Sequence, residues 1–252
     1  LRNTDKSKLS KRKNPTSINY YRDMGYLPEA LLNYLGMMGW TMPNGDEVFT
    51  LAAMEAAFDI SRVSLGGPVF DTEKLDWLNG KYLRESGSDA DFQARLLAWA
   101  QNSGRLEPII PLLRQRVEKL SDVAPLISYF FSGPVSIAPE SFSHCKLAPV
   151  DACRALQFAL WKLEALGAWN RDEVESALMK LAEVLDIKVR DFLAPLFVAI
   201  SGQPVSLSVI DSIAVIGLDL SRARLRIAIE TLGGISKKQA KNLEKEFAQL
   251  GQ

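Results

Sequence analysis

The sequence predicts a mainly α-helical protein, and three patterns support this prediction. Apolar residues recur at helical spacing over most of the chain, most clearly in residues 149–167, where Leu156, Ala159, Leu160 and Leu163 fall on one face. Residues suited to helix caps precede several of these runs. Connections between the runs are mostly two to six residues long, as is usual in helical bundles. We find no internal repeat of fixed period.

The composition is that of a globular protein without a global charge. At 252 residues the chain can form one large or two modest domains with buried cores. Thirty Lys and Arg residues balance thirty Asp and Glu residues, so any nucleic-acid binding must come from local basic patches. No apolar run reaches the length of a membrane span, and no signal-peptide pattern opens the sequence. We therefore expect a cytoplasmic protein without a membrane partner.

The cysteines and the one histidine do not predict a site. Cys145 and Cys153 are eight residues apart, which suits neither a close metal pair nor a disulfide framework, so we expect reduced thiols and no metal. His144 would permit a Ser-His-Asp triad, but no Gly-x-Ser-x-Gly turn accompanies it. A histidine on a surface loop is the simpler interpretation.

Residues 1–86 combine a basic start with short helices. The first 14 residues carry six basic side chains against one acidic side chain. Helical spacing then predicts helices over four ranges: 16–24, 29–38, 51–58 and 72–84. Thr50 and Asp71 are placed to cap the last two of these helices, and Pro28 suits the first turn of the second. Residues 61–70 contain Gly66-Gly67-Pro68 and are predicted to be extended or irregular.

A polar stretch from Glu85 to Asp89 marks the first predicted domain boundary. Beyond it, helical spacing predicts nine further ranges: 91–100, 108–120, 123–131, 149–167, 171–185, 189–200, 209–216, 222–232 and 237–250. Residues 132–148 show no period and are predicted to be a long connection. We therefore expect three domains, residues 1–86, 87–148 and 149–252.

Suitable caps precede four of these later helices. They are Ser121-Asp122, the capping box of Asn170 with Glu173, Ser206 or Ser208, and the capping box of Ser236 with Gln239. The pair Gly233-Gly234 is placed to stop the helix that ends near residue 232.

The first candidate site is the basic run Lys8-Leu9-Ser10-Lys11-Arg12. Two lysines three residues apart can place two ammonium groups on one polyphosphate, where they neutralise charge that develops during transfer. On composition alone, a disordered cationic N-terminus is the other interpretation.

This run resembles the KMSKS loop of class I aminoacyl-tRNA synthetases, and the continuation from Lys13 to Leu35 is similar to bacterial-type glutamyl-tRNA synthetases. The resemblance implies that Lys11 contacts ATP phosphates and stabilises the leaving pyrophosphate. It implies that Lys8 orders the loop and that Ser10 donates a hydroxyl hydrogen bond. Arg12 replaces the last serine of the general motif, as is common in glutamyl enzymes, and joins the residues expected at the ATP phosphates.

The resemblance also implies what this chain lacks. A class I synthetase needs a nucleotide-binding fold with a HIGH-type motif, and this sequence has neither that motif nor a glycine-rich strand–turn–helix pattern. L-glutamate and ATP, with Mg²⁺, would therefore bind mainly through an N-terminal half that is absent here. We expect the chain alone to be a monomer that binds tRNA(Glu) but not DNA, and that cannot charge tRNA.

The implied fold is mainly α: the KMSKS loop with a small helical stem-contact domain, followed by anticodon-binding helical bundles. In the stem-contact domain the predicted helix 72–84 carries Lys74, Lys81 and Arg84, which become candidates for tRNA phosphate contacts. We expect Trp77 and Asn79 to have structural roles. Without the resemblance, this basic face would be an ordinary solvated surface.

The second candidate tRNA contact is Arg114, with Arg116 as a neighbouring candidate. On one helix, two arginines two residues apart point to different sides, so one can be structural while the other reads or stacks on an unpaired base. By resemblance, Arg114 stands where glutamate-specific enzymes read the third anticodon base. The alternative is a surface arginine on an amphipathic helix.

The third candidate contact follows the helix 189–200. By resemblance, the loop that meets the first two anticodon bases comprises Ser206, Leu207, Ser208, Val209 and Ile210. Phe197 departs from relatives that carry an arginine there. The cluster of Arg222, Arg224 and Arg226 has no implied role, and we expect a solvated helix face.

Two alternatives to a glutamate-specific enzyme remain at this point. One is a non-discriminating enzyme that also charges tRNA(Gln). The other, from a different functional class, is a stand-alone helical adaptor that binds RNA or protein and keeps only a vestigial loop.

Overall fold

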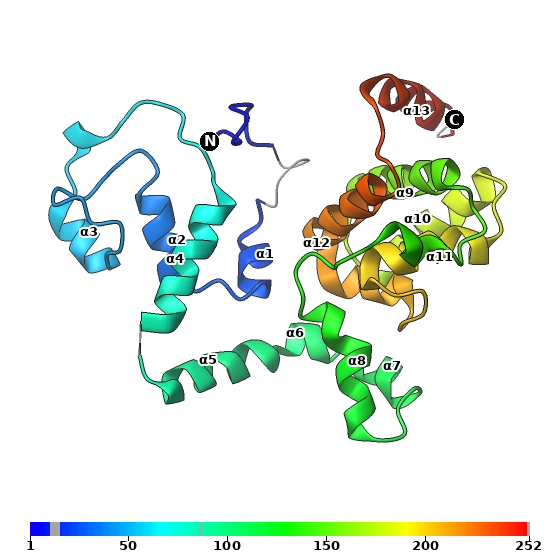
Figure 1. The fold of residues 1–252 in the computed structure, drawn as a ribbon, viewed down its shortest axis with the longest axis horizontal. Helices are drawn as coiled ribbons and strands as arrows, with labels where there is room; N and C mark the ends of the chain where they lie inside the picture. Colours follow the sequence, from blue (N-terminus) through cyan, green and yellow to red (C-terminus); the bar gives the residue numbers. More distant parts are fainter. Residues whose placement is uncertain (11–15, 86, 251–252) are drawn as a thin grey trace. The chain divides into compact units, whose positions relative to one another are not determined.

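The computed structural model describes residues 1–10, 16–85 and 87–250. The chain divides into two compact units, Leu1–Ala100 and Gln101–Gln252, each with its own core (Figure 1). The described residues contain helices and two isolated β-bridges, Arg2 with Lys8 and Arg2 with Val69, but no strand. The prediction of a mainly α fold is confirmed. The three domain boundaries predicted from the sequence remain a prediction.

The first unit contains short helices around a small aromatic core. They are α1 (Ile18–Asp23), α2 (Pro28–Gly36), α3 (Leu51–Ala57), the 3₁₀ turn η1 (Ile60–Arg62), α4 (Thr72–Glu85) and α5 (Asp89–Ala100). The predicted caps are confirmed: Thr50 Oγ1 accepts from the Ala53 amide at 3.1 Å, and Asp71 Oδ1 accepts from the Glu73 amide at 3.0 Å. α4 packs on α2 through fully buried Leu75 and Leu78.

One side-chain amide and one tyrosine on α4 hold this helix against the rest of the first unit. Asn79 Oδ1 on α4 accepts from the Leu27 amide at 2.8 Å, which confirms the structural role expected for Asn79. Tyr82, also on α4, donates to the Phe49 carbonyl at 2.8 Å. These bonds fix the helix that carries three of the candidate phosphate contacts.

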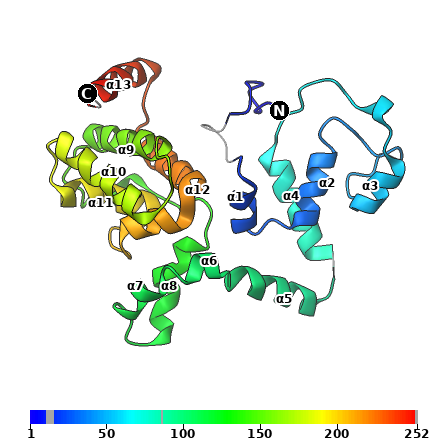
Figure 2. The same cartoon turned by 180° about the vertical axis from the view of Figure 1, so that it is seen from behind.

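The second unit is a helical bundle with a smaller helical extension. Its helices are α6 (Ser103–Leu106), α7 (Ile110–Arg114), α8 (Val123–Ile127), α9 (Pro149–Glu164), α10 (Arg171–Val184), α11 (Val189–Ser201), α12 (Val209–Thr231) and α13 (Lys237–Gln249). Its 3₁₀ turns are η2 (Leu120–Asp122), η3 (Ser128–Phe130) and η4 (Pro139–Phe142). The central helices α9 to α12 lie together (Figure 2). They surround a core that includes fully buried Leu156, Phe158, Leu178, Phe192 and Leu225.

The predicted helix over residues 108–120 is wrong. The structure ends α7 at Arg114, and Lys119 is extended, with φ −144° and ψ 156°. The reason is Asp122, whose Oδ2 accepts from the amides of Glu118 and Lys119 at 3.2 Å each and folds this stretch into a turn. Asp122 occupies the predicted N-cap position of α8, but its side chain makes no capping bond to that helix. The helix predicted over 123–131 is correspondingly shorter.

A break at Gly217 divides α12 into two helical segments. Gly217 has φ 80° and ψ 169°, a conformation that only glycine adopts readily. The first segment begins at the predicted cap, since Ser208 Oγ accepts from the Asp211 amide at 3.4 Å. The second begins soon after Gly217, earlier than the predicted Arg222. In the part of the chain that the structure describes, no helix combines the length and the apolar content that crossing a membrane requires.

Candidate nucleic-acid interface

The N-terminal candidate residues lie on a small turn. The Asn3 amide group donates to Ser7 Oγ at 2.9 Å, and the Arg2–Lys8 bridge closes the turn. Lys8 is exposed and Ser10 is half-buried, so the Lys8 ammonium is accessible to an anion. Lys11 and Arg12 lie outside the described residues. The geometry of the complete basic run therefore stays a prediction.

The three basic residues of α4 differ in their contacts with neighbouring side chains. Lys74 Nζ lies 2.5 Å from Glu47 Oε1, and Lys81 Nζ lies 5.7 Å from the Trp77 ring centroid and 3.9 Å from Glu85 Oε2. Arg84 is exposed. Exposed ion pairs of this kind contribute about 0–1 kcal/mol, so a phosphate can displace the carboxylates at little cost.

Arg114 and Arg116 flank the end of α7. Ile109 and Leu113 are buried in the core of the second unit and anchor α7, while both arginines are exposed. Arg114 is the last helical residue, and Arg116 follows in a turn whose amide donates to the Leu113 carbonyl at 2.8 Å. The expectation that the two arginines occupy different sides of one helix is wrong, because the helix stops between them. Among the described residues, neither has an ion-pair partner.

The segment expected to meet the first two anticodon bases is mostly inside the protein. Leu207, Val209 and Ile210 belong to the core, Ser206 is buried and Ser208 caps α12. The residues just before them, 203–205, are exposed, and Val205 is 69% exposed. The part of this segment open to solvent is therefore residues 203–205, which the sequence analysis did not select. The predicted contacts of residues 206–210 stay a prediction.

Residues 201–203 form one wall of a polar pocket of about 260 Å³. The other wall comes from the stretch after α8. The lining residues are Ser128, Tyr129, Ser132, Pro134, Val135, Ser136, Ser201, Gly202 and Gln203. The hydroxyls of Ser128, Ser132 and Ser201 already donate to backbone carbonyls. The Gln203 amide and the Ser136 hydroxyl can supply donors and acceptors, which is the chemistry that recognises the edges of an unpaired base.

Arg224 connects the stretch after α8, which lines this pocket, with the end of α11, just before the other lining segment. It is fully buried and donates to the carbonyls of Tyr129 at 2.5 Å, Ser132 at 2.6 Å and Gly133 at 3.0 Å. Its fourth acceptor is the carbonyl of Ile200, near the end of α11. A planar guanidinium can serve four carbonyls in this way, whereas a lysine ammonium has only three donors.

The expectation that the arginines of α12 form a solvated face is therefore wrong for two of the three. Arg224 is buried as described, and Arg222 Nε lies 2.7 Å from Glu164 Oε1, with Arg222 Nη1 2.5 Å from Asp219 Oδ1. Arg226 is partly exposed. The sequence carried no direct signal of this, because the carbonyls that receive Arg224 come from segments distant in the chain.

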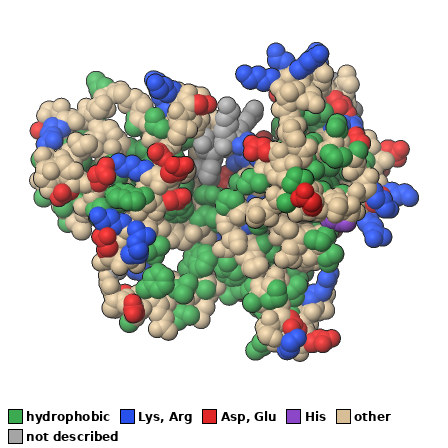
Figure 3. Space-filling view, viewed as in Figure 1, with side chains coloured by type: hydrophobic (Ala, Val, Ile, Leu, Met, Phe, Trp, Pro, Cys, Tyr) green, Lys and Arg blue, Asp and Glu red, His purple; other side chains and the backbone are tan. Residues whose placement is uncertain are grey.

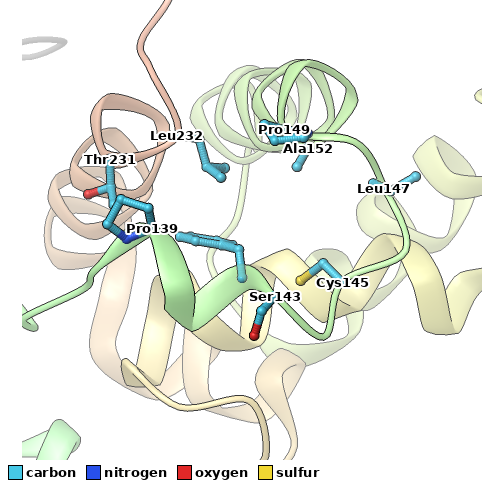
Figure 4. A pocket seen from close by; sticks show the side chains of 9 residues that line it. Pro139, Ser143, Cys145, Leu147, Pro149, Ala152, Thr231 and Leu232 are labelled. Carbon is cyan, nitrogen blue, oxygen red and sulfur yellow. The ribbon is translucent and has the colours of Figure 1, made fainter.

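The cysteines are not arranged for nucleophilic chemistry. Burial raises the pKa of the Cys145 thiol and of the Cys153 thiol, so both stay protonated near neutral pH. Cys145 lines a mostly apolar pocket of about 320 Å³ with Leu147 and Leu232 (Figure 4). His144 Nε2 is 3.9 Å from Cys145 Sγ, too far to activate it by a short hydrogen bond.

Two protein-family models match the chain. Residues 91–229 match the family described as "Anticodon binding domain", which is more than half of the chain. Residues 1–77 match the family described as "tRNA synthetases class I (E and Q), catalytic domain". The second match covers the basic run and the first unit as far as Trp77 on α4.

Individual relatives match along the whole chain. The glutamate–tRNA ligase of Marinobacter nauticus is 54% identical over 251 residues, which is 100% of this chain and 51% of the relative. The glutamate–tRNA ligase of Alcanivorax borkumensis is 56% identical over 250 residues, or 99% of this chain and 50% of the relative. A crystal structure of a glutamate tRNA ligase from Elizabethkingia meningosepticum matches 92% of this chain and 50% of that chain, with a TM-score of 0.47 and 25% identity.

The chain thus spans about half the length of the curated relatives it matches. The helical bundle of α9 to α12, the exposed arginines at the end of α7 and the match over residues 91–229 agree with one another. This chain belongs to the anticodon-binding domain family.

Proposed function

We propose that this chain is the tRNA-recognising, C-terminal part of a glutamate–tRNA ligase. That enzyme would attach glutamate to tRNA(Glu) in an ATP-dependent reaction through glutamyl-adenylate. The observation that carries the proposal is the 52–56% identity to glutamate–tRNA ligases over nearly the entire chain. The matched share of those relatives, about half, supports a division of labour between this chain and a catalytic part.

In this division of labour, the basic run of residues 8–12 would act only when ATP is bound by the catalytic part. ATP with Mg²⁺ and L-glutamate would be held mainly by residues outside this chain. Lys8, Ser10 and, from the sequence, Lys11 and Arg12 would close on the phosphates and neutralise the charge of the leaving pyrophosphate. The exposure of Lys8 supports this role. Lys74, Lys81 and Arg84 would contact tRNA phosphates and set the register of the RNA.

Anticodon recognition would be shared between α7 and the polar pocket. Arg114 would read the third anticodon base, which distinguishes tRNA(Glu) from tRNA(Gln), with Arg116 beside it. Its exposure and its freedom from carboxylate partners among the described residues support this role. The pocket between residues 128–136 and 201–203 would take an unstacked base. Such an enzyme would discriminate against tRNA(Gln), would be cytoplasmic and would act as a monomer.

The substitution Arg114→Gln tests this assignment. We expect the chain to lose its preference between tRNA(Glu) and a tRNA(Glu) changed only at the third anticodon base, by about 1–3 kcal/mol, because one base-reading guanidinium is lost. Competitive binding to the two tRNAs at fixed salt measures the preference. Arg190→Gln, which removes an exposed arginine elsewhere in the second unit, is the matched control. An unchanged preference in Arg114→Gln would refute the assignment.

A further inference from the structure

The C-terminal helix α13 carries an unusual surface. Lys237, Lys238, Lys241 and Lys245 are all exposed, and the structure gives none of them an ion-pair partner among the described residues. At 100° per residue these four positions fall within an arc of about 100° on one face of the helix. Figure 3 shows basic side chains gathered where α13 lies. We call these four residues the α13 lysine face.

The opposite side of α13 holds the helix in place. Phe247 packs against Phe158 and Trp161 of α9, with ring centroids 5.3 Å and 5.2 Å apart. Glu246 Oε1 accepts from Arg154 Nε at 2.8 Å. Ser236 and Gln239 form the predicted capping box. The lysine face is therefore presented by a fixed helix, while the docking contacts use other residues.

The lysines are not placed for the stability of α13. Two of them, Lys237 and Lys238, occupy the first turn, where the helix dipole disfavours a positive charge, and that turn contains no acidic residue. By contrast, Arg171 at the start of α10 is paired with Glu175 and Asp211. A nearby anion would relieve the repulsion among the lysines and the conflict with the dipole. α13 carries two carboxylates, Glu244 and Glu246. Glu246 pairs with Arg154, and Glu244 lies at the edge of the lysine face.

We propose that the α13 lysine face binds the phosphate backbone of RNA without regard to base sequence. A lysine ammonium is a compact charge that suits a phosphate. It lacks the planar, bidentate geometry with which an arginine reads the edge of a base. Figures 1 and 2 both place α13 and α7 at opposite ends of the second unit, so a ligand that contacts both must be long, as tRNA is. The match to the anticodon-binding family ends at residue 229, before α13 begins. This inference rests on the proposed function and adds a second, non-specific contact to it.

The test compares two double variants of the full chain in tRNA binding over a range of salt concentrations. Lys241→Gln/Lys245→Gln should weaken binding by about tenfold near 0.1 M salt and reduce the slope of log K against log salt by about 1–2. The loss should be the same for a tRNA with a changed third anticodon base. The control Lys180→Gln/Lys188→Gln removes the same charge from exposed positions on and beside α10 and should leave the slope unchanged. Circular dichroism verifies that each variant stays helical.

The outcomes separate this inference from the proposed function. Wild-type binding with anticodon-loop protection, together with an unchanged slope in Lys241→Gln/Lys245→Gln, overturns the lysine face and leaves the proposed function standing. An equal loss in the control pair also overturns it, since the effect would then be one of net charge. No tRNA binding by the wild-type chain at low salt overturns the proposed function and this inference with it.

Discussion

At the scale of single residues, Arg224 is the buried cation that joins three parts of the second unit. Its guanidinium satisfies carbonyls of the stretch after α8 and of α11 from a position on α12. Buried carbonyls without a donor are costly, so an apolar replacement leaves several of them unsatisfied at once. Since Tyr129 and Ser132 also line the polar pocket, the loss would affect both stability and the pocket.

We predict that Arg224→Met lowers the free energy of unfolding by about 3–5 kcal/mol, the range for breaking a buried charged network. Arg224→Lys should recover only part of the loss, because an ammonium has too few donors for four carbonyls. Urea unfolding followed by circular dichroism measures the effect. Arg190→Met, at an exposed position, should change stability by less than about 0.5 kcal/mol. A loss in Arg224→Met no larger than in the control would contradict this account.

The two thiols give a prediction about pH. Burial raises the pKa of Cys145 and of Cys153, so the folded state favours the protonated thiols. Their contribution to stability is complete below the pKa of an unfolded cysteine and is lost as pH rises through the higher folded values. At pH 8 we therefore expect alkylation by iodoacetamide to be much slower in the folded chain than in urea. Equal rates in the two conditions would show that the thiols are accessible as thiolates.

At the scale of elements, the break at Gly217 sets the direction of the second half of α12. Its positive φ excludes other residues without strain, whereas Gly167 does not have a positive φ and has open space around its Cα. We predict that Gly217→Ala destabilises the chain by about 1–3 kcal/mol and that Gly167→Ala stays within about 0.5 kcal/mol of the wild type. Thermal unfolding of both variants makes the comparison. Equal stability would mean that α12 tolerates a continuous helix.

The helices that the sequence predicted well are those with both a cap and an amphipathic face. α10 and α13 begin at Asn170 and Ser236 as expected, because each side chain accepts from an amide of its own first turn. The helix over 108–120 failed because Asp122 bonds to upstream amides, a choice that local spacing does not reveal. Capping residues predict a helix start only when no nearby turn competes for the same carboxylate.

The candidate site was predictable to a different extent. Arg114, which is exposed, was selected as a site residue from the resemblance alone. Helical spacing does not distinguish it from any other surface arginine. The polar pocket was not predictable, because its walls come from residues 128–136 and 201–203 and meet only in the folded unit. The burial of Leu207 and Val209 was also missed, although both are apolar residues beside a helix start.

At the scale of the whole molecule, charge is balanced overall and uneven locally. The thirty basic and thirty acidic residues leave no global field to attract RNA. In the proposed function, binding would therefore arise from local basic groups: the exposed arginines at the end of α7, the basic residues of α4 and the α13 lysine face. We expect tRNA affinity that falls steeply with salt, since most of these contacts are to phosphates.

The same division of labour predicts that the chain does not charge tRNA by itself. With ATP, Mg²⁺, L-glutamate and tRNA(Glu), we expect no glutamyl-tRNA, because the basic run would lack the nucleotide on which it acts. Aminoacylation with radiolabelled glutamate measures this, with a glutamate–tRNA ligase of full length as the positive control. Glutamyl-tRNA formed by the chain alone would contradict the proposed division.

The central claim is that this chain recognises the anticodon of tRNA(Glu), and a ribonuclease footprint on that tRNA tests it most directly. The account predicts protection of the anticodon loop at low salt, with protection of the third anticodon base reduced by Arg114→Gln and retained in Arg190→Gln. A tRNA that binds with its anticodon loop fully cleavable, or that does not bind at all, would contradict the claim.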